Sequence, residues 1–237
     1  PEVASKLKAF YNQFCKRPTF NDDYLATFNR PNVELVDVSD AKGVDQITEN
    51  GLIANGREYE VDCIIYASGF EITSSYERRI GIPIFGNDGQ SIYEHWDEGM
   101  RSMHGLMSHG FPNLFLCGGL FVFQLGANYA YGVDVQAEQV AYTVSQLTKR
   151  GVKSANVSRS AEEKWIEDQL SPEGANALFV LGGSADSCTP GYYNQEGTAQ
   201  RYRDVRLESY GKGLGAYRKV LRDWRAQGDL EGLDLTS

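Results

Sequence analysis

Two short runs of apolar residues interrupt the chain without any alternation of polar positions. Residues 63–67 read Cys-Ile-Ile-Tyr-Ala and residues 114–117 read Leu-Phe-Leu-Cys, and Gly69 and Gly118 follow them. A strand covered on both faces reads as a continuous apolar run, whereas a half-exposed strand alternates. The pattern therefore predicts two buried strands, each leading into a turn that contains glycine.

Alternating segments separated by turn residues precede the first apolar run. Residues 33–38 alternate, and three short segments follow at residues 47–48, 51–53 and 59–61. Asn50-Gly51 and Asn55-Gly56 separate these segments, and both residue types tolerate the positive φ angles of tight hairpins. We therefore predict a strand over residues 33–38, followed by a β-meander that leads into the buried strand.

Helical spacing of apolar residues marks four segments, at residues 1–14, 128–149, 160–170 and 216–224. The longest of them runs into Lys149-Arg150-Gly151, and a basic last turn followed by glycine is typical of a helix C-terminus. Residues 71–110 and 171–198 show no such spacing, so both are predicted to be loops.

The order of strand, glycine and helix across residues 114–149 suggests a cofactor site. Dinucleotide-binding folds use this order to direct the N–H groups of a helix N-terminus at a pyrophosphate. The apolar residues before the helix leave these N–H groups in need of an acceptor. A flavin or a pyrophosphate near Asn128 and Tyr129 would supply one. In the alternative interpretation, the aromatic residues before the helix are core residues.

Composition narrows the classes of partner. The 237 residues include 23 Lys and Arg against 32 Asp and Glu, a formal charge of −9. Nucleic-acid binding needs clustered cations, so a general nucleic-acid binder is excluded, although a local pocket for one phosphate is not. No apolar run reaches the ~18 residues of a membrane span. Four scattered cysteines without a CxxC pair favour a reducing, cytoplasmic setting, with Cys63 and Cys117 as small buried hydrophobes.

The chemistry-bearing motifs lie in the first seventy residues. Cys15-Lys16-Arg17-Pro18 puts a basic pair before a proline, and the segments Asn29-Arg30-Pro31-Asn32-Val33 and Asp62–Phe70 follow. On spacing alone, the basic pair is more typical of a solvated surface. The complete order resembles the C-terminal part of the Baeyer–Villiger monooxygenases, which use FAD and NADPH.

The resemblance implies different roles for the two basic residues. In this family the lysine contacts the 2′-phosphate of NADPH, a role that falls to Lys16, and a compact ammonium suits a phosphate. The arginine faces the flavin, stabilises its peroxide anion and holds the nicotinamide amide, which makes Arg17 the candidate catalytic residue and a second cofactor ligand. A guanidinium stays protonated at working pH, so it supplies charge without releasing a proton.

Further candidate site residues follow from the same resemblance. Ala67-Ser68-Gly69 is similar to the family's Ala-Thr-Gly turn, where small residues let the chain cross beside both cofactors, and serine keeps the threonine hydroxyl. The helix start at Asn128 and Tyr129 corresponds to a flavin contact. The wall of the substrate pocket corresponds to Phe123, Gln124 and Leu125.

Residues 187–194 resemble the mobile loop that closes over NADP in relatives. Many relatives carry a tryptophan shortly before the Pro-Gly of this loop, whereas this chain has Gly182-Gly183-Ser184-Ala185 there. The missing aromatic ring leaves room for a bulkier ketone, such as a polycyclic or steroid-like one.

The fold class implied is α/β, with paired dinucleotide-binding (FAD/NAD(P)-binding, Rossmann-like) domains of which this chain holds the C-terminal portion. Residues 1–14 would end a helical insertion, and 15–61 would close the NADPH-binding domain with its β-meander. Residues 62–237 would form the C-terminal part of the FAD-binding domain, with 171–198 as a lid-like loop. No Gly-x-Gly-x-x-Gly follows a strand, so we expect the chain to be a piece of a longer protein whose N-terminal part carries those turns.

The predicted function is oxidation of ketones to esters or lactones with O2, dependent on FAD and NADPH and completed by the N-terminal part of the same enzyme. Two alternatives stay open: an N- or S-oxygenating flavin monooxygenase, and a non-catalytic fragment of a cofactor domain. His95, His104 and His109 lack ligand spacing with cysteines or acids, so they are predicted to be structural or surface residues, and no metal site is predicted.

Overall fold

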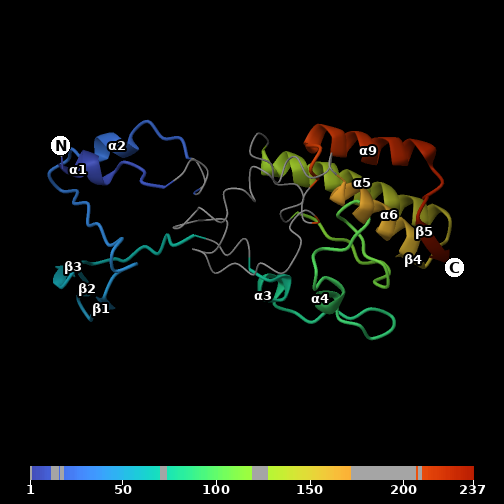
Figure 1. Ribbon diagram of the computed structural model, residues 1–237, viewed down its shortest axis with the longest axis horizontal. Helices are drawn as coiled ribbons and strands as arrows, with labels where there is room; N and C mark the ends of the chain where they lie inside the picture. Colours follow the sequence, from blue (N-terminus) through green and yellow to red (C-terminus); the bar gives the residue numbers. More distant parts are fainter. Residues whose placement is uncertain are drawn as a thin grey trace. The chain divides into compact units, whose positions relative to one another are not determined.

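The computed structural model describes residues 2–11, 16, 19–69, 74–118, 128–171, 207 and 210–237. The chain divides into two compact units, Pro1–Phe70 and Glu71–Ser237 (Figure 1). The finer domain boundaries expected at residues 14 and 61 stay predictions.

The first unit contains the predicted β-meander. Strands β1 (Gln46–Ile47), β2 (Gly51–Ala54) and β3 (Arg57–Glu60) form an antiparallel sheet in that order (Figure 1). Asn55 and Gly56 join β2 to β3 with φ angles of 53° and 73°. Two central residues with positive φ define the hairpin turn whose twist matches that of paired strands. The Asn-Gly signal at this position is therefore confirmed.

The other Asn-Gly pair acts differently from the prediction. Gly51 has no positive φ and is the first residue of β2, opposite Glu60. A Cβ at this position would lie 1.9 Å from the carbonyl oxygen of Tyr59. Glycine is required here by the close approach of two backbones and not by a turn conformation.

Two other predictions for this unit are wrong in extent. The first helix, α1 (Glu2–Lys6), covers less than the expected residues 1–14, of which 12–14 lie outside the described residues. Residues 33–38 form no strand, and a four-residue helix, α2 (Tyr24–Thr27), precedes them. Alternation of polar and apolar residues shows that a segment could form a strand with two different faces, but it does not provide a second strand to pair with.

The prediction of two fully buried strands is also wrong. Residues 63–67 have no strand pairing, and Ile65 and Tyr66 are 85% and 74% exposed. Residues 114–117 have none either and are only partly covered. Cys63 and Cys117 are exposed thiols instead of core residues. An apolar run indicates that a segment is buried in the folded protein, but a strand forms only where a neighbouring strand pairs with it. No strand in the described parts of the chain pairs with either run.

The second unit is built around three helices. They are α5 (Tyr129–Lys149), α6 (Arg159–Leu170) and α9 (Leu214–Gln227), and the hairpin-like pair β4 (Ser154–Val157) and β5 (Leu233–Thr236) lies at one end (Figure 1). The helices predicted at residues 128–149 and 160–170 are confirmed within a residue at each end. The last helix extends beyond the predicted residues 216–224 at both ends.

Residues 71–110 are not wholly irregular, contrary to the prediction. They contain the one-turn helices α3 (Tyr76–Ile80) and α4 (Ile92–His95). The Ser91 hydroxyl accepts a hydrogen bond from the Tyr93 N–H at the start of α4, and the Glu94 carboxylate accepts one from the Ser91 backbone N–H. This capping box stabilises a helix too short to display apolar periodicity.

Packing of α5 against α9 forms one hydrophobic cluster of the second unit, which includes the buried residues Val135, Tyr217 and Leu221. A neighbouring cluster joins the turn at Met103 to Leu147 and Trp224. None of the helices in the described part of the chain combines the length and the apolarity needed to cross a membrane.

Candidate cofactor-binding segments

The start of α5 is the best defined of the candidate cofactor segments. Asn128 is extended, with φ −68° and ψ 128°, and its side-chain oxygen accepts a hydrogen bond of 2.8 Å from the Ala130 N–H. Asparagine is one of the preferred residues at this position, so the sequence itself fixes where the helix begins. Asn128, Tyr129 and Tyr131 are all exposed.

This helix start fits an anionic or electron-rich cofactor. Its first turn contains no acidic residue. A helix N-terminus carries a partial positive charge, which an acidic side chain in the first turn would offset. The tyrosine rings of Tyr129 and Tyr131 add exposed aromatic surface on the same turn. The observed residues therefore suit the flavin contact predicted for Asn128 and Tyr129, which stays a prediction.

A buried hydrogen-bond chain fixes the approach to this helix. Gly118 has a φ of +87°, and a Cβ there would lie 2.7 Å from the Tyr129 hydroxyl. The Gly118 N–H donates to Oε1 of the fully buried Gln136 at 2.7 Å, and the Gln136 amide donates to the Tyr217 hydroxyl at 3.4 Å. The end of the 114–118 segment is thereby held against α5, and the positive φ of Gly118 favours glycine at the contact with Tyr129.

The second candidate segment belongs to the first unit. Ala67, Ser68 and Gly69 are exposed, and Gly69 has a φ of +92°, a conformation that other residues rarely adopt. The preceding Ile65 and Tyr66 are exposed as well. This segment presents a small-residue turn and an apolar stretch, both of which lack cover within the described residues of their unit.

Lys16 is the one member of the basic pair that the structure describes. Its ammonium lies 5.7 Å from the ring centroid of Tyr11, within the range of a cation–π contact. Arg17 lies outside the described residues, as do Phe123, Gln124 and Leu125. The roles predicted for all of these residues therefore stay predictions.

Sequence reasoning missed a buried charged cluster around Glu162. Its carboxylate lies 3.1 Å from the ring nitrogen Nε2 of His95 and 3.4 Å from Nε of Arg101, and accepts a hydrogen bond of 2.8 Å from the His109 backbone. Burial acts to raise the pKa of Glu162, but the hydrogen bonds from His95 and His109 and the nearby positive charges outweigh it, so the pKa is lowered. The cluster ties the loop after α4 to α6.

The three histidines take part in packing and hydrogen bonding, and their spacing in the sequence did not indicate with which residues. His95 and His109 serve the Glu162 cluster, and His104 is almost wholly buried between two tryptophans. The described residues contain no group of three His, Cys, Asp or Glu side chains that could hold a metal ion. No sequence signal marked Glu162, because its partners lie more than fifty positions away.

No protein-family model matches the chain. Among curated proteins, a Baeyer–Villiger monooxygenase of the fungus Stachybotrys chlorohalonatus is 40% identical over 236 residues, which are 99% of this chain and 36% of the relative. The first relatives found are matched over only 36–39% of their length.

Solved structures match over the whole chain. The polycyclic ketone monooxygenase of Thermothelomyces thermophila has a TM-score of 0.83 and 37% identity, covering 100% of this chain and 37% of its own. The chain is a homologue of the C-terminal part of the Baeyer–Villiger monooxygenases. A steroid monooxygenase bound to NADP also matches, with a TM-score of 0.74, 26% identity and coverage of 100% and 41%. The predicted resemblance and fold class are thereby confirmed.

Proposed function

We propose that the protein containing this chain is an FAD- and NADPH-dependent Baeyer–Villiger monooxygenase that converts ketones to esters or lactones with O2. The observation that carries the proposal is the match of the whole chain, in sequence and in structure, to a polycyclic ketone monooxygenase at 37% identity. When bound, FAD and NADPH supply the electrons and the activation of O2.

The residues of this chain bind and position those groups. Lys16 binds the 2′-phosphate of NADPH as a point charge. Arg17 places a permanent positive charge beside the reacting centre and orients the nicotinamide amide. Because a guanidinium does not give up its proton, Arg17 stabilises developing negative charge without protonating it. Backbone groups at Gly69 and at Asn128–Tyr129 contact the cofactors.

The substrate side of the proposal concerns a bulky ketone. Phe123, Gln124 and Leu125 form one wall of its pocket. The lid-like loop over residues 171–198 lacks the tryptophan common in relatives, which enlarges the space for the ketone. The name of the Thermothelomyces relative, which specifies polycyclic ketones, supports a substrate of this size.

The N-terminal part of the same enzyme is the partner that completes the site. The exposed apolar residues Ile65 and Tyr66, directly before the Ala67-Ser68-Gly69 turn, support this part of the proposal. The remaining 60% or so of the relatives' length would supply the strands that cover them.

The test replaces Arg17 in the full-length protein. Arg17→Ala should lower ester formation at least about 100-fold, the loss seen when one electrostatic donor is removed from a preorganised site. Flavin reduction by NADPH, followed by absorbance under anaerobic conditions, should persist. Lys8→Ala, which removes an exposed cation from the same unit, is the matched control and should retain activity.

Product analysis on a panel of ketones, thioethers and tertiary amines separates the proposal from its alternatives. Esters or lactones from ketones that disappear in Arg17→Ala support it. Undiminished ester formation by Arg17→Ala would refute the role of this residue. Sulfoxides or N-oxides without any ester would instead indicate an S- or N-oxygenating enzyme.

A further inference from the structure

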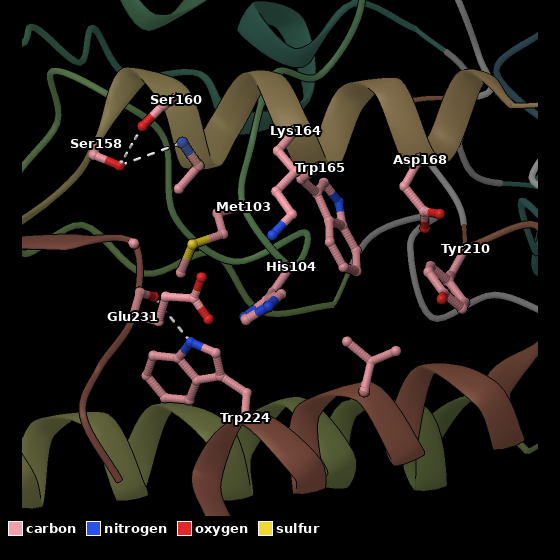
Figure 2. A pocket seen from close by; sticks show the side chains of 13 residues that line it. Met103, His104, Ser158, Ser160, Lys164, Trp165, Asp168, Tyr210, Trp224 and Glu231 are labelled. Atoms are coloured by element: carbon pink, nitrogen blue, oxygen red, sulfur yellow. Dashed lines mark hydrogen bonds between the residues drawn. The ribbon is translucent and has the colours of Figure 1, made fainter. Parts of the chain in front are cut away.

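A cavity of about 530 Å³ lies within the second unit, between α6 on one side and α9 on the other (Figure 2). Cavities of 300–1,000 Å³ are the usual size of small-molecule sites. Asn128 and Tyr129 are the predicted cofactor-binding residues of this unit that the structure describes, and neither is among the residues that line it. The reaction proposed above gives this cavity no role.

The cavity extends along α5, and one of its ends is distant from the candidate flavin contact. Trp224 lines the cavity and its ring packs against Tyr142 of α5, with 6.2 Å between ring centroids. Tyr142 lies thirteen residues beyond Tyr129, which corresponds to about 20 Å along an α-helix at ~1.5 Å per residue. The Trp224 end of the cavity therefore lies far along α5 from the helix start at Asn128 and Tyr129, whereas Trp165 and Tyr210 line it closer to that start, in one cluster with Val135.

The walls of the cavity are aromatic. Trp165 and Trp224 both meet the His104 ring edge-on, with centroid distances of 5.0 Å and 5.6 Å. Tyr210 stacks on Trp165 at 5.5 Å with an interplanar angle of 20°. Figure 2 shows the imidazole and the two indoles gathered around the same space, with Trp165 above and Trp224 below. Flat apolar walls of this kind suit a planar ring system.

His104 is a polar group in the middle of the aromatic wall. Its side chain lines the cavity although the residue is only 7% exposed, and its ring nitrogens have no hydrogen-bond partner in the described part of the chain. Its backbone is held in place, with a φ of +59° and a carbonyl that accepts a 2.7 Å hydrogen bond from the Tyr217 hydroxyl. Buried polar groups in native proteins are nearly always hydrogen-bonded, so the unsatisfied imidazole points to a ligand.

The uncharged state of the His104 ring suits a neutral ligand group. Burial lowers the pKa of His104 to about 4, so the ring is uncharged at neutral pH, with one donor and one acceptor nitrogen. Lys164 and Glu231 bring opposite charges to the cavity wall, and Asp168 is paired with Lys212. The described wall therefore carries charges of both signs, and a neutral hydroxyl matches the donor and the acceptor of the uncharged imidazole.

We propose that this cavity binds a neutral planar aromatic alcohol or phenol, with its rings against Trp165 and Trp224 and its hydroxyl hydrogen-bonded to His104. The inference concerns the second unit alone and does not depend on the proposed oxygenation.

The test uses the full-length, FAD-loaded protein labelled with 5-fluorotryptophan, and 2-naphthol as the probe. Signals in the ¹⁹F spectrum are assigned with the single variants Trp96→Phe, Trp165→Phe and Trp224→Phe. Titration with 2-naphthol should shift the Trp165 and Trp224 signals with one dissociation constant. The Trp96 signal should stay in place, because Trp96 packs in a separate cluster with Ile92 and Phe111.

A second probe tests the hydrogen bond to His104. 2-Methoxynaphthalene keeps the rings but lacks the hydroxyl proton, so it should bind about tenfold more weakly, as expected when a buried acceptor is left unpaired. In His104→Asn the shorter side chain withdraws the polar group, and asparagine tolerates the positive φ. This variant should lose the preference for 2-naphthol while Trp96→Phe keeps it.

Two results overturn the proposal. One is the absence of any shift at Trp165 and Trp224 up to the solubility limit of 2-naphthol. The other is equal affinity of the unsubstituted protein for 2-naphthol and 2-methoxynaphthalene. Both measurements need only the parent sequence and its Trp→Phe variants, so the proposal is decided even if His104→Asn fails to fold.

Discussion

Glu162→Gln tests whether the buried charged cluster holds the second unit together. Glu162 is 1% exposed, and its two carboxylate oxygens are shared among the His95 ring, the Arg101 guanidinium and the His109 backbone N–H. Glutamine has nearly the same shape, so the substitution removes charge without opening a cavity. We expect the second unit to lose stability.

The magnitude follows from which contacts survive. Breaking a buried ion pair by neutralising one partner costs about 3–5 kcal/mol. The loss should be smaller here, because the glutamine carbonyl still accepts from the His109 N–H and the 32% exposed Arg101 side chain regains contact with water. We therefore expect about 2–3 kcal/mol, which for a unit of this size corresponds to a fall in Tm of roughly 5–10 °C.

Urea unfolding followed by tryptophan fluorescence measures this loss. All three tryptophans of the given sequence lie in the second unit, so their part of the signal reports on that unit. The matched control is Glu163→Gln, the next residue of α6, which is exposed and should change stability by less than about 0.5 kcal/mol. If Glu162→Gln unfolds at the same urea concentration as Glu163→Gln, the cluster does not stabilise the unit and the reasoning is wrong.

Three further predictions follow from the same unit. Folding lowers the pKa of His104 from 6.5 to about 4, so as the pH falls the unfolded chain binds a proton at this residue before the folded one does. The free energy of unfolding should therefore drop by up to about 3 kcal/mol between pH 6.5 and pH 4. Unfolding curves that stay constant over this window would contradict the neutral imidazole. The lowered pKa of Glu162 adds stability above its ordinary value of 4.5 that is lost at lower pH, and Glu162→Gln should abolish this part of the acid dependence. Gly232→Ala should lower the free energy of unfolding in urea by about 2–3 kcal/mol, and Gly228→Ala by about 1 kcal/mol. Both glycines have positive φ, but only a Cβ at Gly232 would clash, because it would lie 2.8 Å from the Ala161 side chain. Equal losses in the two variants would contradict the steric argument.

The elements that sequence predicted well are those whose signals are local. Helix α5 begins after its Asn128 cap and ends at Lys149, the first residue of the Lys149-Arg150-Gly151 signal, because capping and apolar spacing act within a few residues. The turn at Asn55-Gly56 needs only two residues that accept positive φ. The Glu162 cluster gave no such signal, since it joins α6 to residues that are distant in sequence.

The exposed apolar segment at residues 63–67 shows why an apolar run led to the wrong prediction of a buried strand. The continuous apolar run at residues 63–67 indicates that this segment is buried against another part of the protein. Burying side chains such as Ile65 and Tyr66 stabilises a fold by about 1.5–3 kcal/mol each. That cover has to come from outside the described part of the first unit. The segment leads directly into the Ala67-Ser68-Gly69 turn proposed to contact the cofactors. Docking of the proposed N-terminal part onto this segment and completion of the proposed cofactor site are therefore expected to be one coupled event.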